Sequence, residues 1–352
     1  MTDVYKELAL HLDNLPAGFP ATESGVEIRI LKRFFSPREA EIATGLKMSP
    51  ETSAAIARRL GVQENEVAPI LESMSKKGLI FRSTRKGETY YMAAQFVIGI
   101  WEYHVNDLDE DLIKDMNEYA PFLSQNTWHK HKTKQLRVVP VGKSVSAEMT
   151  VMPYEVAEEI IKTQSKIVVA PCICRKEHEM KGKGCGKPME TCFSFGSAAY
   201  YYEGNGLGRS ISQEEAIDIL KSGIEAGLVL QPGNAQKPAN ICLCCGCCCQ
   251  ILINLKSTDH PARLVHSNYY AEVNQDECTA CETCVTQCQM DAITMEDTAQ
   301  VDQDRCIGCG LCVPECPSEA MMLRQKEESD QYVPPRSVAE TYLHMARERG
   351  KM

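Results

Sequence analysis

The first hundred residues place apolar side chains at helical spacing and then at strand spacing. A helix is expected over residues 36–46, because Ser-Pro opens it with proline at the first helical position. A second helix is expected to start at the Ser-Pro-Glu of residues 49–51 and to end at Gly61. A third is expected over 65–77, and strand-like runs over 79–82 and 89–92 predict a hairpin.

Further along the chain, residues 106–165 predict a helical bridge, and residues 167–170 predict a short buried strand. A capping box at Ser212 and Glu215 predicts a helix that ends at Gly227. The fold class expected is therefore α+β with several domains. The boundaries expected are 1–105, 106–165, 166–269 and 270–323, with a C-terminal arm over 324–352.

Three helices followed by a hairpin, and in particular residues 53–83, resemble the winged helix-turn-helix domain of bacterial regulators. This resemblance implies a DNA-reading third helix. However, Glu64, Glu66 and Glu72 would repel phosphates there, although the hairpin is basic at Arg82, Arg85 and Lys86. We therefore expect this domain to dock a protein partner or a second copy of the chain, with DNA binding as the less favoured alternative.

Composition narrows the class of protein. The chain has 352 residues, 24% of them charged, and a net charge of -10, which disfavours nonspecific binding to nucleic acid. No stretch approaches the roughly 18 consecutive apolar residues of a membrane span. The N-terminus lacks a basic start followed by an apolar core, so a cytoplasmic protein without membrane insertion is expected. Thiols in a cytosol stay reduced, which favours metal binding over disulfides.

All 18 cysteines lie between residues 172 and 316. Eight form two near-copies of one phrase, with cysteines at 278, 281, 284 and 288 and again at 306, 309, 312 and 316. This is the ligand spacing of a protein that holds two [4Fe–4S] clusters. Zinc would prefer separated cysteine pairs, so the two rows of four argue against it.

The two phrases resemble the bacterial two-cluster ferredoxin domain, in which the fourth cysteine of each phrase binds the other cluster. The resemblance implies one cluster held by Cys278, Cys281, Cys284 and Cys316, and a second held by Cys306, Cys309, Cys312 and Cys288. The family normally has proline after the fourth cysteine. Pro317 fits, whereas position 289 is glutamine, which we expect to change the loop and its hydrogen bonds to sulfur.

Ten cysteines remain in the central region. Cys172 and Cys174 would point to the same side of an extended segment, and Cys185 and Cys192 lie in a Gly- and Lys-rich loop. These four are expected to hold a third [4Fe–4S] cluster, with a tetrahedral zinc ion as the alternative. The other six are expected to hold a fourth cluster, cubane or non-cubane: Cys242, Cys244, Cys245, Cys247, Cys248 and Cys249. A disulfide-active dithiol is the minority interpretation.

The Cys244-Cys245-Gly246 element resembles heterodisulfide-reductase-type subunits, whose Cys-Cys-Gly motifs bind unusual cubane-derived clusters, although the paired motifs of that family are missing. More broadly, residues 170–316 resemble 4Fe–4S-binding proteins of anaerobic bacteria and archaea. That resemblance implies electron transfer and gives no substrate.

We therefore expect an iron–sulfur electron carrier that relays electrons as a subunit or partner of an anaerobic redox complex. It is expected to be an oxidoreductase subunit more than a stand-alone enzyme. Two alternatives stay open: a redox-sensing transcription regulator that uses the winged helix, and a catalytic redox subunit acting at residues 242–249.

Overall fold

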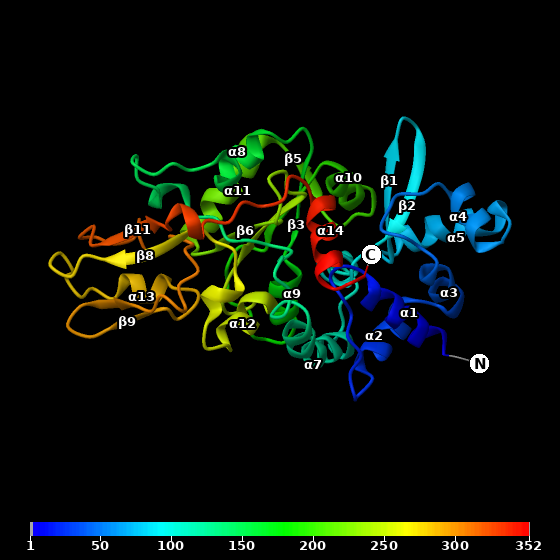
Figure 1. Ribbon diagram of the computed structural model, residues 1–352, viewed down its shortest axis with the longest axis horizontal. Coiled ribbons are helices and arrows are strands. Elements are labelled where there is room, and N and C mark those ends of the chain that lie inside the picture. The colour runs from blue at the N-terminus through cyan, green and yellow to red at the C-terminus, as the bar shows by residue number, and fades with distance from the viewer. Residues whose placement is uncertain (1–2, 352) are drawn as a thin grey trace. The chain divides into compact units, whose positions relative to one another are not determined.

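The computed structural model describes residues 3–351, which divide into two compact units (Figure 1). Unit 1 comprises residues up to 133, residues 197–209 and residues from 342 onward. Unit 2 comprises residues 134–196 and 210–341, and it contains every cysteine of the chain. Within residues 3–351, no helix combines the length and the apolar character needed to cross a membrane.

Unit 1 is mainly helical. Its elements are α1 (Val4–Asn14), α2 (Val26–Phe34), α3 (Pro37–Thr44), α4 (Ser53–Leu60), α5 (Glu64–Lys76), β1 (Ile80–Arg85), β2 (Glu88–Ala93), η1 (Phe96–Ile100), α6 (Trp101–Tyr103), α7 (Glu110–Asn126) and α10 (Gly196–Gly204), together with most of α14 (Val338–Glu348). Its core contains the rings of Phe19, Phe96 and Tyr119, which pack edge-on or tilted within 6.0 Å of one another.

The helices and the hairpin expected between residues 36 and 93 are confirmed, with one correction. The hairpin turns tightly at Lys86-Gly87, where both residues have positive φ. Helix α4 does not begin at residues 49–51. Its N-cap is Thr52, whose hydroxyl accepts from the Ala55 N–H, because the backbone of Glu51 pairs with Tyr91 of β2 instead.

The upstream part of unit 2 is built on a five-stranded sheet in the order β5-β3-β4-β7-β6. The strands are β3 (Ile167–Pro171), β4 (Glu190–Phe195), β5 (Arg209–Ile211), β6 (Val229–Pro232) and β7 (Asn240–Cys244). Helix α11 (Gln213–Glu225), capped by Ser212 as expected, packs against β3 and β4. The remaining helical segments are η2 (Gly142–Ser144), η3 (Pro153–Glu155), α8 (Ala157–Lys162), α9 (Ile173–Met180), α12 (Gln250–Lys256) and η4 (Pro261–Leu264).

The downstream part of unit 2 consists of two small antiparallel ladders, drawn yellow to orange in Figure 1. Strand β8 (Tyr269–Val273) pairs with β11 (Met321–Gln325), and β9 (Ile293–Met295) pairs with β10 (Ala299–Val301). Helix α13 (Thr283–Gln287) lies between β8 and β9 in the sequence, and η5 (Glu328–Asp330) follows β11. Cysteines make up much of the interior, so little purely apolar core is available to this part.

Candidate metal centres

The eight cysteines of the downstream part surround two separate cavities. One cavity is lined by Cys278, Cys281, Cys284 and Cys316, and the other by Cys288, Cys306, Cys309 and Cys312. These are the two sets that the ferredoxin resemblance implied. In each cavity three thiols come from one phrase and the fourth from the other, because the β8–β11 and β9–β10 ladders bring the phrases together.

Backbone amides point at several of these sulfurs. The Ala271 N–H donates to Cys306 Sγ at 3.3 Å, and the Ala292 N–H donates to Cys288 Sγ at 3.2 Å. In the other cavity the Ala299 N–H donates to Cys278 Sγ at 3.4 Å. Such N–H···S bonds stabilise thiolate charge and raise the reduction potential of a bound cluster.

The two cavities differ in exposure. Cys281 is exposed, and the hydroxyl of Thr283 lowers the pKa of its thiol. In the second cavity, burial raises the pKa of Cys309 to about 12 and raises that of Cys312 well above its usual range. Burial thus disfavours the free thiolate form of Cys309 and Cys312, and the positive charge of a bound cluster would favour it.

Glycine at position 308 is required by the fold of the second phrase. Its φ is +67°, and a Cβ there would overlap the carbonyl oxygen of Tyr269 in β8. The strap of residues 137–144 also reaches this loop, since the Val141 N–H donates to the Cys309 carbonyl at 3.1 Å. The loop that carries Cys309 is thus held from both sides.

The ten central thiols are grouped in space differently from their order in sequence. Four of them have Sγ atoms that all lie within 4.8 Å of one another: Cys185, Cys245, Cys247 and Cys248. We call these the four-thiol site. The other six form a continuous row through hydrogen bonds between successive thiols: Cys172, Cys174, Cys249, Cys244, Cys242 and Cys192. We call these the six-thiol row.

The row is assembled by the sheet and by two helix starts. Cys192 of β4 lies directly opposite Cys242 of β7, and Cys244 lies two residues further along β7 on the same face. Cys172 is the N-cap of α9, with Cys174 in the first turn, while Cys249 is the N-cap of α12. The thiols of Cys192 and Cys244 donate to Cys242 and lower its pKa well below the usual range.

Two sequence-based expectations need correction here. Cys192 lies on strand β4 rather than in a loop, because it pairs with β3 and β7. Cys174 lies on a helix rather than on an extended segment, although its thiol still meets that of Cys172. Consequently Cys185 and Cys192, which were expected to share a site, belong to different groups of thiols.

Buried Arg175 lies between the two groups. Its guanidinium donates to Cys245 Sγ at 3.7 Å and to the Leu243 carbonyl at 3.1 Å, and also contacts the Thr191 hydroxyl. Burial opposes its charge, but the charge of Cys172 and the bond to Cys245 raise its pKa overall. Sequence reasoning missed this residue, whose only signal was its position directly after Cys172-Ile173-Cys174.

Two buried donors near the row lack a hydrogen-bond partner within the described residues. One is Arg175 Nε, and the other is Nε2 of Gln231, which lies opposite Cys242 across the β6–β7 pair. Orphaned buried donors are costly unless an acceptor is present. Each of these two donors could therefore bond an acceptor beside the six-thiol row.

The segment that carries the central thiols contacts the downstream part of unit 2 through hydrogen bonds of neighbouring residues. The Gly246 N–H donates to Gln289 Oε1 at 2.9 Å, and a Cβ on Gly246 would overlap the Gln289 carbonyl oxygen. The Arg305 guanidinium donates to the carbonyls of Lys256 (3.0 Å) and Thr258 (3.2 Å) at the end of α12. These bonds hold the loop of Cys288 against the turn that carries Cys245 and Cys247.

Residues 271–323 match the family model of the 4Fe–4S dicluster domain. The downstream part of unit 2 is therefore an iron–sulfur domain, and its cysteine-lined cavities fit iron–sulfur clusters. No curated protein and no solved structure matches the chain. A [4Fe–4S] cluster carries a single electron at a time, so this domain fits electron transfer.

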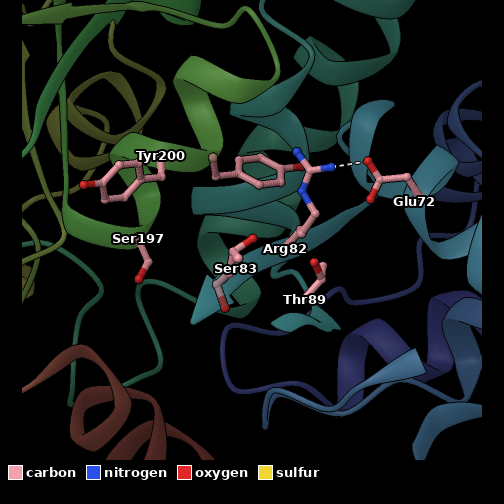
Figure 2. Close-up of a pocket in the computed structure, with 8 residues that line it drawn as sticks. Glu72, Arg82, Ser83, Thr89, Ser197 and Tyr200 are labelled. Atoms are coloured by element: carbon pink, nitrogen blue, oxygen red, sulfur yellow. Dashed lines mark hydrogen bonds and ion pairs between the residues drawn. The ribbon is translucent and has the colours of Figure 1, made fainter. Parts of the chain in front are cut away.

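A cavity in unit 1 offers little chemistry by comparison. It has a volume of about 470 Å³ and is lined by Glu72, Arg82, Ser83, Thr84, Thr89, Ser197, Tyr200 and Tyr201. Figure 2 shows that Arg82 points at Glu72, with which it forms an ion pair. The Tyr91 hydroxyl also donates to Glu72, at 3.1 Å. Glu72 and Arg82, the charged residues that line this cavity, therefore neutralise each other. The residues that line it include no cysteine.

Proposed function

We propose that this chain is an electron-transfer protein in which two [4Fe–4S] clusters of the dicluster domain exchange electrons with a third iron–sulfur centre in the six-thiol row. Cys278, Cys281, Cys284 and Cys316 hold one cluster, and Cys288, Cys306, Cys309 and Cys312 hold the second. Cys172, Cys174, Cys192, Cys242, Cys244 and Cys249 hold the third centre.

The hydrogen bond from the Gly246 N–H to Gln289 carries this proposal. Gln289 directly follows Cys288, a ligand of the second cluster. Gly246 lies two residues after Cys244, a member of the six-thiol row. The bond therefore brings these two cysteines close to the same point of contact. The attachment supports a relay inside one chain.

Unit 1 serves in this proposal as a docking domain for a redox partner or for a second copy of the chain. A DNA-binding regulator is the other candidate for a winged helix-turn-helix domain. Two observations argue against DNA binding. Helix α5 starts with the acidic residues Glu64 and Glu66. In the hairpin, the ion pair with Glu72 neutralises Arg82, one of its few basic residues. Docking is therefore the function that we assign to this unit.

Iron and sulfide analysis of the anaerobically purified full chain tests the proposal. We expect clearly more than about eight irons per chain, of which about eight belong to the dicluster domain. Cys242→Ser should lower the iron content to about eight, and Cys309→Ser should lower it by about four. Fewer than about eight irons in the unaltered chain would refute the dicluster assignment, and an unaltered value of about eight would refute the third centre.

A further inference from the structure

The four-thiol site joins two distant segments of unit 2. Cys185 lies in the loop between α9 and β4, whereas Cys245, Cys247 and Cys248 come from the turn between β7 and α12. All four Sγ atoms lie within 4.8 Å of one another, and those of Cys247 and Cys248 are 3.8 Å apart. These four thiols, from two segments, supply the number of donors that a tetrahedral metal site needs.

The size of this set points to a single ion. Zinc binds thiolates at about 2.3 Å, so the sulfurs of a regular tetrahedral site with four cysteine ligands lie about 3.8 Å apart. A cubane places four irons between its thiolates and needs a wider arrangement. The downstream cysteines illustrate the difference, since those eight thiols, all within the described residues, line two cavities and form no group this tight.

We propose that Cys185, Cys245, Cys247 and Cys248 bind one zinc ion as a structural site. Four thiolates suit tetrahedral zinc, and a site of this type binds Zn²⁺ more tightly than Fe²⁺. This inference is independent of the proposed electron transfer, because zinc has no redox chemistry.

Neighbouring groups compensate the net negative charge of the site. The buried guanidinium of Arg175 donates to Cys245 Sγ at 3.7 Å, and the Lys187 backbone N–H donates to Cys185. Donors to ligating sulfurs are the usual outer partners of zinc–thiolate sites.

The ion would stabilise a loop that has no regular secondary structure. The loop of residues 181–189 contains no strand or helix, and the zinc would fix it to the turn that carries Gly246. Lys187 of the same loop donates to the Ala226 carbonyl, beside Gly227, whose Cα faces Gln287 and Gln289. The site therefore preshapes the surface on which the loop of Cys288 docks.

Zinc and iron analysis of anaerobically purified full-length chains tests this site. We expect about one zinc per unaltered chain, and none in Cys185→Ser or Cys247→Ser, with iron unchanged in both variants. Cys192→Ser, in the six-thiol row, is the matched control and should keep the zinc while losing iron.

Zinc K-edge X-ray absorption on the unaltered chain gives a second readout that needs no variant. We expect four sulfur neighbours at about 2.3 Å. Absence of zinc overturns the site, as does a shell of nitrogen or oxygen, or a loss of iron in Cys185→Ser. An iron content below about eight in the unaltered chain would refute the dicluster assignment and leave the zinc result standing.

Discussion

The side-chain oxygen of Gln289 accepts a hydrogen bond of 2.9 Å from the backbone N–H of Gly246. Position 289 is where the first cysteine phrase departs from the proline expected after its fourth cysteine. Proline has no side-chain acceptor, so it could not make this bond. At this position glutamine therefore links the dicluster domain to the turn of the central thiol region.

Gln289→Ala should loosen this attachment. Loss of one hydrogen bond costs about 1 kcal/mol, which corresponds to roughly fivefold faster hydrogen exchange of the Gly246 amide. Gln289→Glu keeps the acceptor and is the matched control. Equal protection of Gly246 in the alanine variant and the unaltered chain would show that the bond does not hold the loops together.

Gly246→Ala should disturb the contact between these two loops more than Gln289→Ala does. The added Cβ would overlap the Gln289 carbonyl oxygen, so backbone has to move, at a cost of about 1–3 kcal/mol. We expect intact iron content but slower electron exchange between the dicluster domain and the six-thiol row, measured by stopped-flow reduction. An unchanged rate would mean that electrons do not depend on this contact.

Arg175→Gln should lower the reduction potential of the centre in the six-thiol row. Reduction adds negative charge, which the buried guanidinium near Cys172 and Cys244 of the row stabilises. We expect a shift on the order of 100 mV, or about 2.3 kcal/mol per electron, which is the size expected for charges several ångströms apart at an effective dielectric of about 20. Arg175→Lys keeps the charge and should shift the potential less. A redox titration followed by electron paramagnetic resonance decides, and a raised potential in Arg175→Gln would contradict the electrostatic role.

The stability of unit 1 should depend on pH through Glu39. Burial opposes the charge of this carboxylate, but bonds from Lys77 (2.6 Å) and Ser36 outweigh burial and lower its pKa below 4.5. A lowered folded pKa stabilises the folded state above pH 4.5, and this contribution is lost as the pH falls through the folded value.

Glu39→Gln should therefore be less stable than the unaltered chain by about 1 kcal/mol near pH 6, and the difference should vanish in acid. Both tryptophans of the chain, Trp101 and Trp128, lie in unit 1, so urea unfolding followed by their fluorescence reports on this unit. A difference that persists unchanged at low pH would show that the charge of Glu39 contributes nothing.

Local sequence signals predicted much of unit 1 and of the dicluster domain. Helix α5 and the β1–β2 hairpin follow from spacing and turn residues, and the two cysteine phrases implied which thiols surround each cavity. The start expected for α4 was wrong because Glu51 pairs with Tyr91, which is far away in the sequence. Pairing of this kind leaves no local signal.

The grouping of the ten central thiols could not be predicted from the sequence for the same reason. Sequence position grouped Cys185 with Cys192, whereas the β4–β7 pairing places Cys192 beside Cys242 and leaves Cys185 to meet Cys245. The strand order β5-β3-β4-β7-β6 involves residues far apart in the chain, so spacing alone could not reveal it. Arg175 was missed for a related reason, because its partners come from β4 and from the end of β7.

A stoichiometric reductive titration of the anaerobic full chain tests the central claim most directly. Each [4Fe–4S] cluster of the dicluster domain takes up one electron, and the six-thiol row adds a further redox centre. We predict an uptake of more than about two electrons per chain, which falls to about two in Cys242→Ser. An uptake of about two electrons or fewer in the unaltered, iron-replete chain would contradict a relay between the dicluster domain and the central thiols.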